Sequence, residues 1–134
     1  DGVIKKFFFP THFQTSHTHA RSVCQSYGMD FAMIESNDEY ISVANMLQKN
    51  GNQQYVILIE GITYTSKSQT EWFFTRTGEK IPFAMTWSPN QPDDGGSNEK
   101  CLSFISLSPL YQFNDIPCNA VYPFLCQKYN QRLP

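Results

Sequence analysis

Residues 87–94 read WSPNQPDD, and this stretch decides both the fold and the site that we expect. Within it, Gln91 and Asp93 flank a proline, so their side chains can point to the same side of a rigid turn. Further side-chain oxygens of the same two kinds follow on Glu99, Asn114 and Asp115. Carboxylate and amide oxygens are hard ligands, which suit Ca²⁺ better than zinc or copper. The pattern therefore predicts a calcium-dependent binding site for a sugar rather than a catalytic centre.

The size and composition of the chain indicate one globular unit. With 134 residues, the chain can bury one hydrophobic core but not two, so we expect residues 1–134 to form a single domain. Its 11 Phe, 7 Tyr and 2 Trp supply large side chains for that core. A net charge of −2 and no basic stripe argue against nucleic acid as a partner. No apolar run approaches the roughly 20 residues that span a bilayer, so we expect no membrane insertion.

The cysteines indicate the compartment. Their number is even and they lack the C-x₂-C spacing of a zinc site; they are Cys24, Cys101, Cys118 and Cys126. Two disulfides are the better interpretation, and the sequence alone allows three pairings. Four reduced thiols in a cytosolic protein are the alternative. We expect a secreted protein, and the start at Asp1 without a charged and apolar leader indicates a mature or trimmed chain.

Two helices are predicted in the first half of the chain. Ser16 can cap the first, Gly28 can end it, and its buried face would hold Ala20, Val23, Cys24 and Tyr27. Residues 36–39, SNDE, form a capping box for the second helix, which Gly51 closes. The apolar stripe of this second helix would consist of Tyr40, Val43, Ala44 and Leu47.

Short strands are predicted around a long loop. We expect them at residues 5–9, 55–59, 102–105 and 123–126. Between Gly61 and Glu99 the signals for regular structure become sparse, and a loop of this length in a small domain is usually functional. Because the oxygen-rich side chains begin within this loop, we expect it to carry the site. Helices first, followed by short strands, indicate an α+β fold.

Taken together, these residues resemble the C-type lectin-like domain family over nearly the whole chain. ARSVC at residues 20–24 is similar to the family's first helix, and FAMI at residues 31–34 is similar to the entry to its second helix. The long loop and the last strands are matched by WSPNQPD at 87–93, EKC at 99–101, FNDIPC at 113–118 and FLC at 124–126. The chain most resembles short-form, secreted lectins of invertebrates. The resemblance implies two helices, two small antiparallel sheets, a long calcium- and sugar-binding loop, and the disulfides Cys24–Cys126 and Cys101–Cys118.

The same resemblance implies the chemistry of the site. One principal Ca²⁺ would be bound, and the residues that ligate both ion and sugar would be Gln91, Asp93, Glu99, Asn114 and Asp115. The Gln-Pro-Asp triplet is similar to the family's galactose type, whereas Glu-Pro-Asn is its mannose type, and Pro92 is implied to be cis. The implied function is a secreted lectin, not an enzyme, that binds glycans with terminal galactose-like sugars in innate immunity.

Three positions depart from the family pattern. Residues 94–98, DGGSN, offer no aromatic side chain where galactose-type members carry a Trp, so we expect weaker binding and less selectivity over mannose. Phe113 stands where a Trp commonly precedes Asn-Asp, and we expect its core packing to survive. Lys100 stands where some members have an acid that serves an auxiliary calcium, so we expect no second ion.

Other functions are weighed against the lectin. The main alternative is a lectin-like domain that binds protein, or pairs with another lectin-domain chain, without calcium or sugar. Emptied ligand positions would mark that case, and here all of them are filled. Asp93, Asp94 and Glu99 could be a glycosidase acid pair, but such a pair needs one raised pKa in an apolar pocket, and this loop is polar and rich in glycine.

Three further features have a structural interpretation. His12, His17 and His19 suggest a metal cluster, but no cysteine or acid supports them, so we expect a solvated helix face. Trp72 and Trp87 are expected in the core or as loop anchors rather than as sugar-stacking platforms. Lys5 and Lys6 are expected at a solvated strand end.

Overall fold

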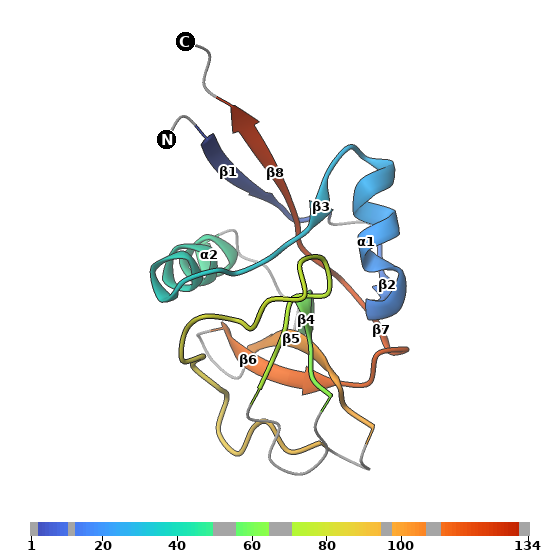
Figure 1. Ribbon diagram of the computed structural model, residues 1–134, viewed down its shortest axis with the longest axis vertical. Helices are drawn as coiled ribbons and strands as arrows, with labels where there is room; N and C mark the ends of the chain where they lie inside the picture. Colours follow the sequence, from blue (N-terminus) through green and yellow to red (C-terminus); the bar gives the residue numbers. More distant parts are fainter. Residues whose placement is uncertain are drawn as a thin grey trace.

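The computed structural model describes residues 3–10, 13–49, 56–64, 71–94, 98–106 and 111–131. Its elements follow in the order β1 (Val3–Phe8), β2 (Thr15–Ser16), α1 (His17–Ser26), β3 (Asp30–Phe31), α2 (Asn37–Lys49), β4 (Val56–Ile62), β5 (Cys101–Ser106), β6 (Tyr111–Ile116), β7 (Val121–Tyr122) and β8 (Cys126–Gln131) (Figure 1). The predicted α+β class is confirmed. No helix in these ranges is both long and apolar enough to cross a membrane.

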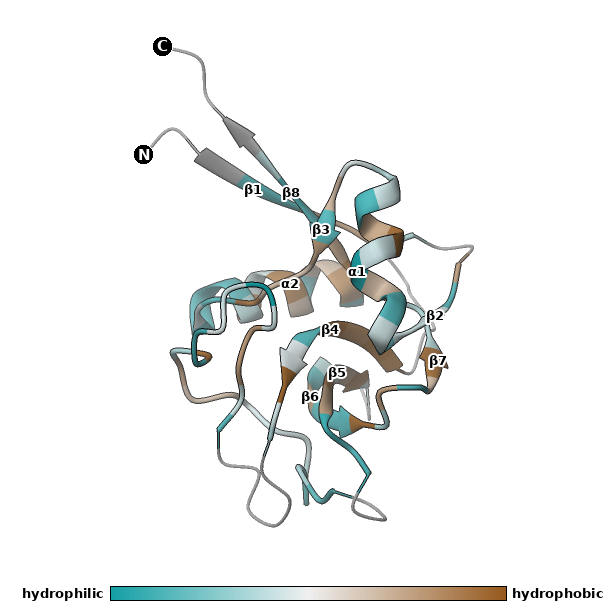
Figure 2. Cartoon of the chain, turned by 45° about the vertical axis from the view of Figure 1, so that its right-hand side comes forward, coloured by the Kyte–Doolittle hydropathy of each residue, from teal (hydrophilic) through white to brown (hydrophobic). Residues whose placement is uncertain are grey.

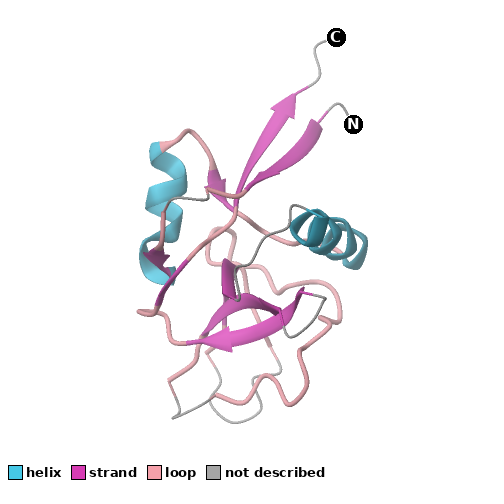
Figure 3. Cartoon of the chain, turned by 180° about the vertical axis from the view of Figure 1, so that it is seen from behind, coloured by secondary structure: helices cyan, strands magenta, loops and turns pink. Residues whose placement is uncertain are grey.

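Within the described residues the strands form three small antiparallel sheets, rather than the two that the resemblance implied, because the short strands β2 and β7 pair with each other. Strand β8 lies between β1 and β3, β5 lies between β4 and β6, and β2 pairs with β7. The first and last strands, β1 and β8, lie side by side, and much of the long loop between β4 and β5 lies toward the opposite end of the molecule (Figures 1 and 3). The fold therefore leaves the loop free to carry a site away from β1 and β8.

Helix α1 ends where glycine allows the chain to turn. Ser16 occupies the N-cap in an extended conformation, but its side chain caps no backbone amide. At the other end, Gly28 adopts a φ of +76°, a left-handed conformation that glycine tolerates best. The predicted buried face is correct for Ala20 and Cys24 but wrong for Tyr27, which lies beyond the last helical turn and is 49% exposed.

Helix α2 begins at the predicted cap. The Ser36 hydroxyl accepts a hydrogen bond from the Glu39 amide at 3.1 Å. The Glu39 carboxylate accepts one from the amide of Glu35, so the box closes one residue earlier than its usual form. The predicted apolar stripe is confirmed, because its members are the buried residues of α2: Tyr40, Val43, Ala44 and Leu47. The predicted closing residue, Gly51, lies outside the described residues.

Strand β4 is buried because it lies between two hydrophobic clusters. Ile57 and Ile59 face a cluster formed with the stripe of α2 and with β5 and β6, whereas Val56 and Leu58 face a cluster formed with α1. Alternate side chains of a strand point to opposite faces, so both faces of β4 must be apolar. Figure 2 shows most of this strand in the brown of hydrophobic residues. The continuous apolar run in the sequence is thereby explained; its predicted first residue, Tyr55, lies outside the described residues.

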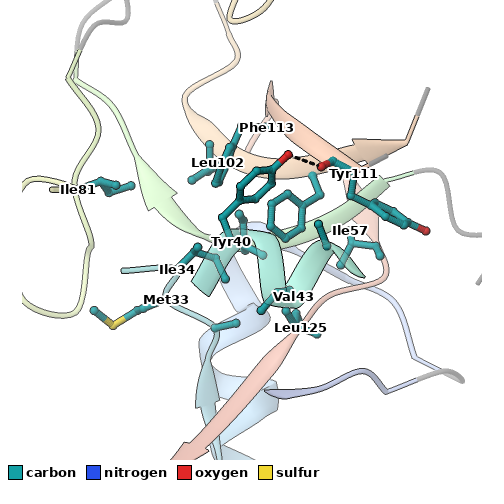
Figure 4. Packing of buried hydrophobic residues seen from close by; sticks show 14 of the residues in the cluster. Met33, Ile34, Tyr40, Val43, Ile57, Ile81, Leu102, Tyr111, Phe113 and Leu125 are labelled. Carbon is teal, nitrogen blue, oxygen red and sulfur yellow. Dashed lines mark hydrogen bonds between the residues drawn. The ribbon is translucent and has the colours of Figure 1, made fainter. Parts of the chain in front are cut away.

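The first cluster joins α2 to the sheet of β4, β5 and β6. Tyr40 packs its ring 5.1 Å from the ring centroid of Phe113 and 5.9 Å from that of Phe104. Its hydroxyl donates a hydrogen bond of 2.8 Å to the backbone carbonyl of Tyr111 (Figure 4). The polar tip of this buried tyrosine is thus satisfied, which fixes α2 against β6.

The two disulfides are Cys24–Cys126 and Cys101–Cys118, as the resemblance implied. The first spans 102 residues and joins α1 to the start of β8, and the second spans 17 residues and closes the β5–β6 segment. In the chain-entropy model the longer loop restricts the unfolded chain more. The N-terminal helix and the C-terminal strand are therefore held together covalently.

One predicted strand needs correction, and strand β6 was missed. The segment 123–126 is not a strand along its length, since β8 begins only at Cys126. Its preceding residues bond directly to β4: Leu58 exchanges backbone hydrogen bonds with Pro123 and Leu125. Strand β6 was not predicted, because an Asn-Asp pair is unfavourable in strands, and pairing with β5 supplies the stabilisation instead.

The sequence predicted that Lys5 lies at a solvated strand end, but the structure shows that its side chain is mostly buried. Only 10% of its side chain is exposed. Its ammonium donates to the carbonyl of Met33 at 2.6 Å, to Glu35 at 2.7 Å and to Glu39 at 2.9 Å. Lys6, the next residue on β1, points to the other face and is exposed, as expected. Lys5 therefore ties β1 to the start of α2.

We expect Lys5→Ala to lower the free energy of unfolding by about 1–3 kcal/mol, because it leaves a partly buried carbonyl and carboxylate without their donor. Lys6→Ala is the matched control and should change the free energy by less than about 0.5 kcal/mol. Urea unfolding of the three proteins measures both values. Equal effects of the two substitutions would show that the Lys5 contacts do not stabilise the fold.

His17 also departs from the predicted solvated face. It is buried, and its Nε2 donates to the backbone carbonyl of Ile59 at 2.7 Å. Its ring packs edge-on against Phe31 with 5.0 Å between centroids. Burial penalises the imidazolium and lowers the pKa of His17 from 6.5 to about 4. His19 is exposed, as expected, and His12 lies outside the described residues, so His17 has a structural role that the sequence did not indicate.

His17 should make stability depend on pH. The unfolded chain binds a proton on this imidazole below about pH 6.5, whereas the folded chain binds it only near pH 4. Stability is therefore lost as the pH falls through this window, by roughly 3 kcal/mol in total. In urea unfolding at pH 7 and pH 4.5, His17→Gln should flatten the decline, and the exposed control His19→Gln should not. An unchanged decline in His17→Gln would assign it to other groups.

Candidate metal and ligand site

The long loop is anchored on β6 by aromatic side chains and backbone hydrogen bonds. Trp72 is buried and its ring lies 5.4 Å from that of the half-buried Trp87. Phe113 exchanges backbone hydrogen bonds of 2.9 Å with the loop, donating to Thr86 and accepting from Ser88. The predicted core and loop-anchoring roles of both tryptophans are confirmed. Phe113 is fully buried, so the core packing expected at this position is also confirmed.

A tight turn follows this anchor and presents the triplet. Asn90 has a φ of +67° and Asp94 a φ of +49°, both in the left-handed region that Asn and Asp tolerate better than most residues. The amide of Gln91 donates to the carbonyl of Ser88 at 2.9 Å. The peptide bond between Gln91 and Pro92 is cis, as the resemblance implied.

Three of the predicted ligands lie together. Asp93, Glu99 and Asp115 each offer a carboxylate oxygen, and these oxygens all lie within 4.8 Å of one another. Asp115 is buried on β6, Glu99 is half-buried just before β5, and Asp93 is exposed on the turn. The carboxylate of Asp115 accepts the backbone amide of Asp93 at 3.3 Å, which positions the turn over the strand. Segments distant in the sequence thus meet at one acidic cluster.

The two predicted amide ligands are close in sequence to members of this cluster. Asn114 is buried on β6 and precedes Asp115, and its partner across the ladder is Ser103 on β5. Gln91 is half-buried, and its side-chain oxygen Oε1 is buried without a hydrogen-bond donor among the described residues. A buried oxygen without a partner costs about 1–3 kcal/mol. Such an atom, two residues before Asp93 in the chain, fits a ligand for a cation, which would satisfy it.

The electrostatics of the cluster also suit a cation. Burial raises the pKa of Asp115, and the negative charge of the Asp93 carboxylate raises it further, although the amides of Asp94 and Asp93 partly oppose this. Carboxylates that gather at this distance repel one another unless a positive charge lies between them. A divalent ion is the strongest local charge that could supply it.

Asp94 and Lys100 form an ion pair in this region that was not predicted from the sequence. The Lys100 ammonium lies 2.7 Å from a carboxylate oxygen of Asp94, and the other oxygen of Asp94 accepts the Glu99 amide at 3.0 Å. The hydrogen bond from Lys100 lowers the pKa of Asp94. An acid held ionised in this way does not suit the proton donor of a glycosidase. No local sequence pattern marks such a pair, because a glycine-rich segment separates its members.

Solved structures share the fold. The carbohydrate-recognition domain of the mouse scavenger receptor C-type lectin superimposes with a TM-score of 0.72 at 22% identity, over 97% of this chain and 92% of that one. Human lithostathine superimposes with a TM-score of 0.76 at 18% identity, over 97% of this chain and 98% of that one. At these identities the likeness establishes the architecture. It confirms the predicted C-type lectin fold with two helices, small antiparallel sheets and two disulfides.

Relatives among characterised proteins include insect lectins. The chain is 25% identical to lectin subunit alpha of Sarcophaga peregrina over 126 residues, which are 92% of this chain and 44% of that protein. It is 32% identical to a hemolymph lipopolysaccharide-binding protein of Periplaneta americana over 122 residues, covering 81% of this chain and 43% of that protein. The chain therefore spans less than half the length of these two relatives.

The family model of the lectin C-type domain matches residues 14–128. This match extends from just before α1 into β8 and includes the long loop, so it contains every predicted site residue. Domains of this family generally bind Ca²⁺, and the family is one of carbohydrate-binding rather than catalytic proteins. The match and the relatives together support a lectin function. The chain belongs to the C-type lectin domain family.

Proposed function

We propose that this chain is a calcium-dependent lectin with one principal ion site, whose ligands are Gln91, Asp93, Glu99, Asn114 and Asp115. Two observations carry the proposal: the acidic cluster of Asp93, Glu99 and Asp115, and the buried, unpartnered Oε1 of Gln91, two residues before Asp93. Oxygen ligands of this kind and number fit Ca²⁺, which accepts six to eight of them in flexible geometry. Lys100 forms an ion pair with Asp94, so this acid is already neutralised by a cation. The pair therefore supports one calcium ion rather than two.

Sugar recognition would then follow from the hydrogen-bonding inventory of the ligands. The ion, when bound, supplies open coordination positions for two neighbouring sugar hydroxyls. Each hydroxyl can donate its proton to a carboxylate and accept one from an amide NH₂. Asp93 and Glu99 serve as acceptors in this scheme, whereas Gln91 and Asn114 serve as donors. The chain's own residues thus orient the sugar, and an unsuitable hydroxyl pair leaves polar groups unsatisfied.

The order of amide and acid around Pro92 supports a preference for galactose. With Gln91 before the proline and Asp93 after it, the donor comes first and the acceptor second. The Glu-Pro-Asn order reverses these roles, so a different pair of hydroxyls is matched. The glycans we propose as partners therefore carry terminal galactose-like sugars. A single exposed sugar site binds weakly, on the order of millimolar, so useful binding would need several sites on one assembly.

The surroundings in which the lectin acts can also be proposed. The two disulfides are stable in an oxidising compartment, which supports secretion. The Periplaneta relative is named for hemolymph and for binding lipopolysaccharide, a microbial glycolipid. We infer a role for this chain in recognising glycans in innate immunity.

Calcium binding is the first test of the site. Calorimetric titration of Ca²⁺ should show one ion per chain, and Glu99→Gln should weaken binding by at least about tenfold, since removing one charged ligand costs about 1.5–3 kcal/mol. Glu79→Gln, an exposed acid on the same loop, is the control and should bind normally. In a thermal melt, calcium at 100 times its Kd should add about 2.7 kcal/mol of stability. A folded protein that takes up no calcium would overturn the proposal.

Sugar preference is tested by exchanging the order around Pro92. The double variant Gln91→Glu/Asp93→Asn keeps the net charge and the number of ligand oxygens, so it should keep its calcium. Its preference for galactose over mannose should shift toward mannose by about tenfold, the size expected for one or two exchanged hydrogen bonds. Competition of both free sugars against a galactose-bearing surface measures the shift. An unchanged ranking with calcium still bound would place selectivity outside the triplet.

A further inference from the structure

An ion pair lies directly beside the proposed calcium site. Asp94 is only 8% exposed, and one of its carboxylate oxygens lies 2.7 Å from the ammonium of Lys100. Its other oxygen accepts the amide of Glu99 at 3.0 Å. The backbone of Asp94 is itself in the left-handed region, with a φ of +49°. The Asp94 carboxylate thus links the backbone next to Asp93 with the backbone of Glu99.

Both members of this Asp94–Lys100 pair are hydrogen-bonded to the sheet of β4, β5 and β6. The amide of Asp94 donates to the buried carboxylate of Asp115 on β6 at 2.7 Å. The carbonyl of Lys100 accepts the amide of Thr63 at 3.0 Å, which continues the pairing of β4 with β5. The ammonium therefore reaches the turn from a fixed strand end.

The Asp94–Lys100 pair counteracts the electrostatic repulsion within the acidic cluster. Carboxylates of Asp93, Glu99 and Asp115 with oxygens within 4.8 Å of one another repel each other in the calcium-free protein. Two of them, Asp93 and Glu99, lie on loop backbone that could separate to relieve the repulsion. The contacts from the Asp94 carboxylate to the Glu99 amide and to Lys100 oppose that separation without using a ligand oxygen. The Asp94 amide adds a hydrogen bond to one carboxylate oxygen of Asp115.

We propose that the positively charged side chain of Lys100, through its ion pair with Asp94, holds the ligands Asp93 and Glu99 in their calcium-binding geometry before the ion binds. Lys100 is then a positioning residue that raises calcium affinity by pre-organising the site, although its own charge repels the ion. The inference rests on the proposed function of the site. It also implies that Asp94, already paired, does not take a second ion.

The sign of two mutational effects separates this role from simple charge repulsion. Lys100→Met removes a positive charge and Asp94→Asn removes a negative one, and each breaks the pair. If the pair positions the loop, both variants weaken calcium binding, by about three- to tenfold, and the double variant is no weaker than the weaker single variant. If Lys100 acts only through its charge, Lys100→Met tightens binding and Asp94→Asn weakens it. Lys80→Met, an exposed loop lysine, is the control and should change nothing.

A second measurement reads the loop without calcium. In EDTA, hydrogen exchange at the Glu99 amide should be faster in Lys100→Met and Asp94→Asn than in the wild-type protein, while Lys100→Arg should retain protection. Normal Glu99 exchange in both variants, or tighter calcium binding by Lys100→Met, overturns the positioning role. Faster exchange in variants of a protein that binds no calcium would support the positioning role and refute the proposed function, so the two failures are distinguishable.

Discussion

The docking of the long loop onto β6 is the constraint on which the rest of the site depends. Phe113 bonds to the loop backbone on both sides of Trp87, and Asp115 accepts the amides of the turn that follows. The same short strand is paired with β5 and covered by α2 through Tyr40. A segment without regular structure is therefore held by a buried, paired strand, which is how a loop site can keep its geometry.

The contacts with β6 stabilise a group of ligand side chains that would otherwise be unfavourable to hold together. The repulsion among the clustered carboxylates of Asp93, Glu99 and Asp115 raises the free energy of the calcium-free protein, and the unpartnered oxygen of Gln91 adds to it. Such unfavourable groups persist at functional sites because surrounding contacts over-determine them. Here those contacts are the anchors on β6, the disulfide Cys101–Cys118 and the Asp94–Lys100 pair. A bound cation would remove the repulsion between the carboxylates and give the Gln91 oxygen a partner. Calcium binding is therefore linked to the order of the loop.

The sequence predicted those features whose signals are local. The cap and stripe of α2, the end of α1 at Gly28 and the buried strand β4 each depend on residues close together in the chain. Strand β6 was missed because its Asn-Asp pair opposes strand formation, and only pairing with a distant strand overrides it. The burial of Lys5 and His17 could not be predicted either, since their partners lie 28 and 42 residues away in the sequence.

The site was accessible from sequence only as a pattern. Spacing and residue type, together with the family resemblance, selected the set of oxygen ligands, and the structure brings Asp93, Glu99 and Asp115 into one cluster. The unpartnered oxygen of Gln91 and the ion pair of Lys100 depend on three-dimensional contacts that no spacing encodes.

The central claim is that this cluster, with Gln91, binds one calcium ion which in turn binds the sugar. A crystal structure of the protein grown with Ca²⁺ and galactose tests it most directly, because anomalous scattering locates the ion and its ligands. The account predicts one ion bound to Oε1 of Gln91 and to Asp115, with two neighbouring galactose hydroxyls completing its shell. An ion found elsewhere, or a cluster without an ion at millimolar calcium, would contradict the account.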